Sequence, residues 1–104
     1  MARTPSPYRT NNNLTKLLIL EQAKRVTTAN DGSRPSIKQL EEELALHCGV
    51  QADTINLLRR NKTQASLQVA LKICEYLGQP VEKVFYIIDN PDYEQELEQE
   101  AVYV

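Results

Sequence analysis

The fold is decided by residues 49–85, which have the sequence GVQADTINLLRRNKTQASLQVALKICEYLGQPVEKVF. Gly49 precedes a short amphipathic pattern that ends in a cluster of cations, and Ser66 and Gly78 bracket a second helical pattern. Serine is a preferred N-cap, and glycine tolerates the positive φ found just after a helix. The stretch therefore predicts two short helices, joined by the polar residues 61–65.

The first of these helices, from about Gln51 to Arg60, has two distinct faces. Ile55 and Leu58 lie three residues apart, so we expect them to face the core. At 100° per residue the opposite face carries Asp53, Asn56 and Arg60, with Leu57 beside them and Ala52 at its edge. The helix thus presents mainly polar side chains to solvent.

Three further helices complete an all-α, five-helix domain. A stripe of leucines predicts a helix from Asn13 to about Val26, and Pro80 suits the first turn of a last short helix. Ser36 and Gln39 form a capping-box pattern at the start of a helix that Gly49 ends. In this helix we expect Glu41 to lie outside or at the margin of the buried stripe, on the solvated face with the next two glutamates.

Both ends of the chain differ from this body. Residues 1–12 contain prolines, asparagines and two arginines, and predict a flexible, disordered basic arm. Residues 13–90 form the predicted domain, and residues 91–104 an acidic tail. Six acids follow residue 88, whereas the first 88 residues hold 12 Lys and Arg against 8 Asp and Glu, a net charge of +4. A sequence pI of about 5.4 therefore does not exclude a DNA-binding body.

The remaining composition limits the possible functions. With 104 residues the chain has room for one domain and one modest core. It has neither a long apolar run nor the apolar part of a signal peptide, so we expect a cytoplasmic protein without a membrane span. Cys48 and Cys74 fall at apolar helical positions and predict buried, reduced thiols. We expect no metal site, cofactor or catalytic residues, and hence no enzyme.

Several short motifs, spaced without a gap, connect the chain to a known family. They are Leu44-Ala45, Gly49-Val50, Thr54-Ile55, Leu58, Ser66-Leu67, Lys72-Ile73, Leu77-Gly78 and Val84-Phe85. In these motifs the sequence resembles the phage-repressor-like, Xre-type helix-turn-helix family over most of its length. The resemblance implies a lambda-repressor-like fold, double-stranded DNA as partner, a homodimer, and a role in transcription regulation as a repressor.

The resemblance also has departures. The loop between the first two helices, residues 27–35, is longer than is usual in the family. Glu41 stands where the family has a glutamine that often touches a phosphate, so this contact is expected to be lost. Arg59 and Asn61 replace the usual Glu and Gly at the end of the recognition helix, which makes this end more basic.

The outward face of the recognition helix predicts the contacts with DNA. Amide side chains pair with adenine, arginine forks onto guanine, and cations and hydroxyls hold phosphates. The expected base contacts are Gln51, Ala52, Asp53, Asn56 and Arg60, and the expected phosphate contacts are Arg59, Lys62, Thr63, Asn61 and Arg34. Asp53 equally suits a helix N-terminus, where a carboxylate is favoured. In relatives, acidic residues on the preceding helix touch RNA polymerase, so Glu42 is a candidate for such a contact, with a solvated helix face as the alternative.

A second hypothesis is a protein-interaction module, such as an antitoxin or adaptor, for which DNA binding is secondary. The acidic tail carries Tyr93, Leu97, Ala101 and Val102, which are spaced to form an apolar stripe for a protein partner. The apolar segment from Phe85 to Ile88 and the C-terminal Val102-Tyr103-Val104 are candidate self-association surfaces.

Overall fold

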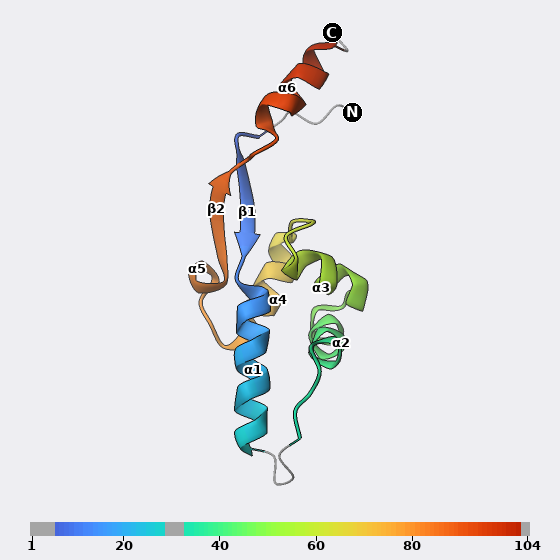
Figure 1. The fold of residues 1–104 in the computed structure, drawn as a ribbon, viewed down its shortest axis with the longest axis vertical. Coiled ribbons are helices and arrows are strands. Elements are labelled where there is room, and N and C mark those ends of the chain that lie inside the picture. Colours follow the sequence, from blue (N-terminus) through green and yellow to red (C-terminus); the bar gives the residue numbers. More distant parts are fainter. Residues whose placement is uncertain (1–5, 29–32, 103–104) are drawn as a thin grey trace.

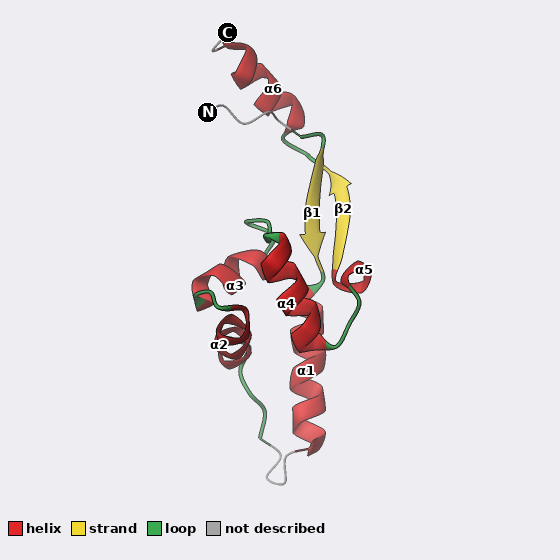
Figure 2. Ribbon diagram, turned by 180° about the vertical axis from the view of Figure 1, so that it is seen from behind, coloured by secondary structure: helices red, strands yellow, loops and turns green. Residues whose placement is uncertain are grey.

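The computed structural model describes residues 6–28 and 33–102, and shows a small, mostly helical domain with a two-stranded antiparallel sheet (Figure 1). The elements are β1 (Tyr8–Asn12), α1 (Leu14–Thr28), α2 (Ile37–Cys48), α3 (Ala52–Arg59), α4 (Leu67–Leu77), α5 (Val81–Val84), β2 (Phe85–Asp89) and α6 (Tyr93–Val102). The first four helices form the body. The sheet extends from one end of it, and α6 continues beyond the sheet, away from the body (Figures 1 and 2).

The helix boundaries follow the capping residues. Ser36 Oγ accepts from the Gln39 amide at 3.1 Å and the Gln39 side chain accepts from the Ser36 amide at 2.8 Å, which confirms the predicted capping box. Gly49 and Gly78 adopt the predicted left-handed conformation at the ends of α2 and α4, with φ of 73° and 64°. Ser66 caps α4 by accepting from the Val69 amide. Local chemistry therefore sets where these helices start and stop.

One hydrophobic cluster joins α1 to α5. It is built by the stripes that the sequence predicts: Leu14, Leu18, Leu40, Leu44, Ala45, Cys48, Ile55, Leu58, Ile73, Cys74 and Val84 are all buried. Cys48 and Cys74 are free, buried thiols, as predicted, and their burial raises the pKa of both. The core thus holds α3 by its inward pair, Ile55 and Leu58.

The prediction of an all-α fold with a flexible N-terminal arm is wrong for the described part of the arm. Tyr8–Asn12 form β1, which pairs antiparallel with β2 from Tyr8 opposite Asp89 to Asn12 opposite Phe85. The polar sequence of β1 carries no strand pattern, and its partner lies more than 70 residues away, so local periodicity could not reveal the pairing. The first five residues of the predicted arm lie outside the described residues.

The predicted number of helices was also too low. Six helices occur among the described residues, and the sixth, α6, begins within the segment expected to be only an acidic tail. Its first residues are held by Asn90, whose side chain accepts from the Asp92 amide at 3.0 Å and donates to Glu96 at 3.2 Å. Asn90-Pro91 thus ends the strand and starts a new helix.

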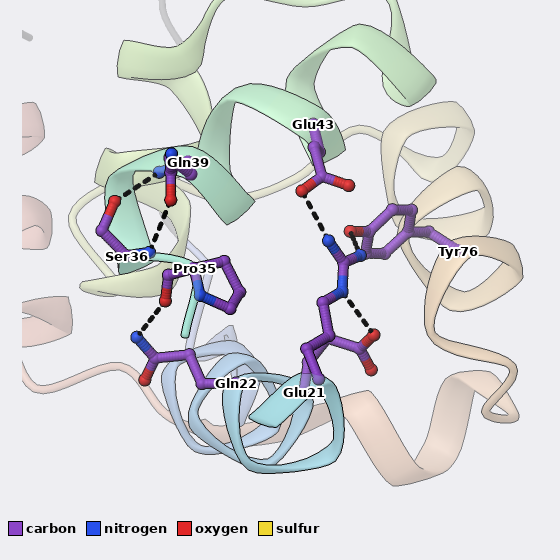
Figure 3. Close-up of polar contacts among 8 residues, drawn as sticks. Glu21, Gln22, Pro35, Ser36, Gln39, Glu43 and Tyr76 are labelled. Carbon is purple, nitrogen blue, oxygen red and sulfur yellow. Dashed lines mark hydrogen bonds and ion pairs between the residues drawn. The ribbon is translucent and has the colours of Figure 1, made fainter. Parts of the chain in front are cut away.

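The body is also held by an ion-pair cluster between three helices. Arg25 of α1 donates to Glu43 of α2 at 2.7 Å, to Glu21 of its own helix at 3.2 Å and to the Tyr76 hydroxyl of α4 at 3.1 Å. Figure 3 shows Glu21, Glu43 and Tyr76 converging from these helices. The bond to Glu43 raises the pKa of the Arg25 guanidinium above its ordinary value, so the cation is stabilised in place.

Asn12 joins the sheet to the recognition-helix candidate. The residue is 7 % exposed, and its side-chain amide donates to the Leu58 carbonyl at 2.7 Å and to Asn61 Oδ1 at 3.2 Å. Its Oδ1 accepts from the Leu14 amide at 3.0 Å, and its backbone amide donates to Asn61 Oδ1 at 3.0 Å. One side chain therefore ties the end of β1, the start of α1 and the end of α3 together.

Removing this side chain should destabilise the domain. In Asn12→Ala the Leu58 carbonyl and the Leu14 amide lose buried partners, so we expect a loss of about 2–3 kcal/mol in the free energy of unfolding. Urea denaturation followed by circular dichroism measures it. Asn11→Ala is the matched control, because the Asn11 side chain makes no hydrogen bond within the described structure. Equal losses in both variants would contradict the role of Asn12.

Candidate nucleic-acid interface

The candidate site is built on the α2–Gly49–α3 unit. Gly49 turns the chain in the left-handed region, and the Val50 amide closes the turn by donating to the Ala45 carbonyl at 3.0 Å. Gln51 is the N-cap of α3 and Arg60 is its C-cap, so the predicted range from Gln51 to Arg60 matches the helix with its caps. Core packing on one side leaves the other side of α3 facing solvent.

The predicted base-contact residues differ in exposure. Gln51, Asp53 and Arg60 are exposed, whereas Ala52 and Asn56 are partly buried. Asn56 Oδ1 accepts from Arg60 Nη1 at 3.4 Å, which brings the amide and the guanidinium one helical turn apart into contact. Leu57 adds an apolar side chain, 43 % exposed, to the same surface. Asn56 and Arg60 therefore supply a donor and acceptor pair on the outward face of α3, and Gln51 adds an exposed amide at its N-terminal end.

In the connection from α3 to α4, one predicted phosphate contact is held by bonds to β1 and two others are exposed. Asn61 has a positive φ of 57°, and its side-chain oxygen accepts hydrogen bonds from the backbone and side-chain amides of Asn12. Gln64 Oε1 accepts from the Thr10 amide of β1 at 3.0 Å. Lys62 and Thr63 lie between these two anchored residues and are exposed. The structure thus holds Asn61 inward and presents Lys62 and Thr63 at the tip of the loop.

Arg59 lies in a different environment from the one expected for a phosphate contact. Its Nε donates to Glu41 Oε2 at 3.2 Å, and its Nη1 donates to Thr15 Oγ1 at 3.4 Å. Thr15 in turn donates to the Arg59 carbonyl at 3.1 Å. The Arg59 side chain is only 20 % exposed, so it joins α1, α2 and α3 within the body.

The position predicted for Glu41 is wrong. Its side chain is 8 % exposed and faces Arg59, rather than lying on the solvated face of α2. The physical reason is charge compensation: a carboxylate can be buried where a guanidinium from a neighbouring helix neutralises it. In the sequence the two residues are 18 positions apart, and each by itself looks like an ordinary surface residue.

Two further predicted contacts lie on other parts of the surface. Arg34 is exposed in residues 33–36, which lead into α2 at the end of the body away from the α3–α4 connection (Figures 1 and 2). Glu42 is exposed on α2. Both are accessible, but neither contributes to the cluster of Gln51, Arg60 and Lys62.

Sequence reasoning missed the residues that orient this surface. Asn12, Thr15 and Gln64 make side-chain bonds to the backbone of α3 or β1 over at least 44 positions in the chain. Asn11 and Asn12 were the one visible signal, and the sequence pattern assigned them to a disordered arm. The hydrogen bonds of Asn12, Thr15 and Gln64 fix the C-terminal end of α3 and the loop after it.

The charge of the candidate surface is modestly positive. Arg60 and Lys62 are exposed cations and Asp53 is the exposed anion of the first turn of α3. The N-terminus of α4 follows directly, and the first amides of a helix attract phosphate through their unpaired N–H groups and the helix dipole. The surface can thus bind an anionic backbone through a few directed contacts.

Other kinds of site find no support among the described residues. They contain no group of three or more His, Cys, Asp or Glu side chains that could hold a metal ion, and no helix long and apolar enough to cross a membrane. Comparison with protein-family models gave no match, and neither did a search of curated proteins.

A double-mutant cycle tests the internal role of Arg59. We expect Glu41→Ala to lower the free energy of unfolding by about 2–3 kcal/mol, because it leaves a largely buried guanidinium uncompensated. Glu41→Ala combined with Arg59→Ala should cost less than the sum of Glu41→Ala and Arg59→Ala made singly, with a coupling of at least about 1 kcal/mol. Urea denaturation measures all variants. Glu42→Ala, on the same helix but exposed, should change stability by less than about 0.5 kcal/mol. Additive single and double changes would argue against the pair.

Proposed function

We propose that this protein is a sequence-specific, double-stranded DNA-binding transcription regulator, acting as a repressor, with α3 in the major groove. The observation that carries the proposal is the exposed surface of α3, where Asn56 and Arg60 lie in contact on the outward face, Gln51 is exposed at the N-terminal end, and Lys62 and Thr63 follow directly. A helix enters the major groove readily, and amide and guanidinium side chains suit its base edges.

Within this proposal the base contacts come from polar side chains at the surface of α3 and its caps. Arg60 forks onto a guanine, and Gln51 and Asn56 pair with adenine edges. The 3.4 Å contact between Asn56 and Arg60 supports a joint role, since each side chain limits the rotamers of the other. Ala52 and Asp53 lie at the N-terminal end of the helix, next to Gln51, where they can contact neighbouring bases.

The phosphate contacts come from the loop after α3. Lys62 and Thr63 are exposed and held between the anchored residues Asn61 and Gln64, so the loop is pre-positioned for a DNA strand. The N-terminus of α4 adds backbone amides. Arg59 and Asn61 act as positioning residues in this revised assignment, and Arg34 remains a candidate for a peripheral backbone contact.

A lambda-repressor-like domain of the phage-repressor, Xre-type family is the finer fold assignment that we propose. The order of α1 to α5, the glycine turn between α2 and α3, and the capped α4 support it. Members of this family commonly bind two-fold sites as dimers, with half-sites about one helical turn apart (roughly 34 Å). We therefore propose a homodimer on DNA. The exposed Glu42 is the candidate for a polymerase contact.

The alternative function, a protein-interaction module, draws its support from α6. This helix lies beyond the sheet and away from the body (Figure 1), and its Leu97 is 41 % exposed among acidic residues. A short, solvent-exposed helix gains little stability by itself, so a protein partner would complete it.

The Arg60 and Lys62 side chains should contribute differently to DNA binding. With a selected target sequence, Arg60→Ala should weaken binding by about 1–3 kcal/mol and relax the preference at one base pair. Lys62→Ala should weaken binding to all sequences alike and reduce the salt slope by about 1. Randomised-site selection followed by fluorescence anisotropy over a salt series measures both effects.

Lys24→Ala, in the C-terminal half of α1, is the control and should leave affinity and salt slope nearly unchanged. Unchanged base preference in Arg60→Ala would refute its assignment. If the intact protein shows no salt-sensitive DNA binding at low ionic strength, the proposed function fails.

Deleting residues 91–104 separates the two functions. If α6 binds a protein partner, the shortened chain should lose a co-purifying protein and keep its DNA affinity, because α3 and its anchors lie in the remaining part. Affinity purification followed by mass spectrometry, with anisotropy on the same samples, measures both. Retention of every co-purifying protein by the shortened chain would reject the partner role of α6.

A further inference from the structure

The rest of the described chain covers one edge of the β1–β2 sheet with hydrogen bonds and leaves the other edge open. On the outer edge of β1, the Thr10 amide donates to Gln64 Oε1 and the Asn12 amide donates to Asn61 Oδ1. Both acceptors belong to the α3–α4 connection. The body therefore covers this edge, as proteins commonly do with strands that could otherwise pair with another chain.

The outer edge of β2 has no such cover in the described structure. In an antiparallel pair, alternate residues direct their backbone groups toward the partner strand. Since Thr10 and Asn12 bond outward, Arg9 and Asn11 face β2, and their partners in the register are Ile88 and Tyr86. The backbone groups of Ile87 and Asp89 consequently point outward, and no described residue bonds to their amides.

The side chains of β2 reinforce the open edge. Ile87, at the centre of the strand, is 73 % exposed, and Tyr86 is 41 % exposed. The strand, FYIID, contains no lysine, proline or bulge of the kind that blunts an edge. A two-stranded sheet is marginal by itself, and this one extends away from the helical body (Figure 2).

We propose that the β2 edge is a dimer interface, on which β2 of a second copy of this chain pairs antiparallel across a two-fold axis at Ile87. The two sheets then become one continuous four-stranded sheet in the order β1-β2-β2-β1. This pairing does not require DNA, so it can be tested separately from the proposed function.

The backbone groups of the edge fit this arrangement. Each Ile87 exchanges both of its free backbone groups with Ile87 of the partner subunit, and each Asp89 amide reaches the Phe85 carbonyl across the axis. The Phe85 amide needs no partner, because it donates to Val81 within its own chain. All free edge amides thus find acceptors in a second copy.

Side chains and charge fit a second copy as well. Ile87 faces its own symmetry mate, and Tyr86 faces Ile88 of the partner subunit, an aromatic and β-branched pair of the kind that stabilises sheets. Lys83 lies just before β2, and Asp89 and Asp92 lie at its end and just beyond it, so antiparallel pairing sets the acidic end of one copy beside Lys83 of the other. Glu82 offsets part of this attraction.

Sedimentation equilibrium without DNA tests the interface. Wild type should dimerise, and Ile87→Pro should raise the dimer dissociation constant by at least about tenfold, because proline removes an outward amide and is tolerated at a strand edge. Ile87→Val is the matched control, which keeps the amide and should remain dimeric. Circular dichroism and urea denaturation verify that the proline variant is folded.

Disulfide trapping tests the position of the axis even if the proline variant does not fold. Ile87→Cys should form a covalent dimer on mild oxidation, since directly opposed residues meet the distance needed for a disulfide. Ile88→Cys and Asp89→Cys should cross-link far more slowly, because their opposites are Tyr86 and Phe85; the native thiols are buried. A wild type that stays monomeric at high concentration, or faster cross-linking at Ile88 than at Ile87, would overturn the proposal.

Discussion

The Asn12 side chain is the constraint on which the arrangement of this protein depends. It is buried where β1 ends and α1 begins, and it bonds to the end of α3 and to the loop after it. A buried amide without partners loses more free energy through desolvation than a hydrogen bond contributes to stability. The network is therefore favourable only when every group in it is paired. Because it is complete, α3 and the loop after it are held against the sheet.

Ion pairing inside the body separates the arginines that hold helices together from the cations that stay at the surface. Arg25 pairs with Glu43 and Arg59 pairs with Glu41, and both pairs join helices of the body. Arg60 and Lys62 remain at the surface beside the outward face of α3. A chain with a net negative charge can thus still present a small positive surface, and this contrast between neighbouring arginines underlies the proposed binding mode.

Local sequence chemistry predicted most of the helical body and the outward face of α3. Ser36 with Gln39, Gly49, Ser66 and Gly78 set helix ends through bonds to residues nearby, so their effect could be foreseen. The sheet, the burial of Glu41 and the anchoring of Asn61 could not, because each depends on a partner 18 or more positions away. The polar segment of β1 in particular has no periodicity that separates a strand from a disordered arm.

The sequence by itself determined the caps, the apolar stripes and the set of side chains on the solvent face of α3, because periods of 3.6 residues and capping bonds act within one or two turns. Only the tertiary structure decided which of those charges are free. Arg59 and Arg60 are adjacent in the chain, yet one faces Glu41 and the other faces solvent, since 100° of helix rotation turns them toward different neighbours. The same long-range packing covers one edge of the sheet and leaves Ile87 on the other edge exposed.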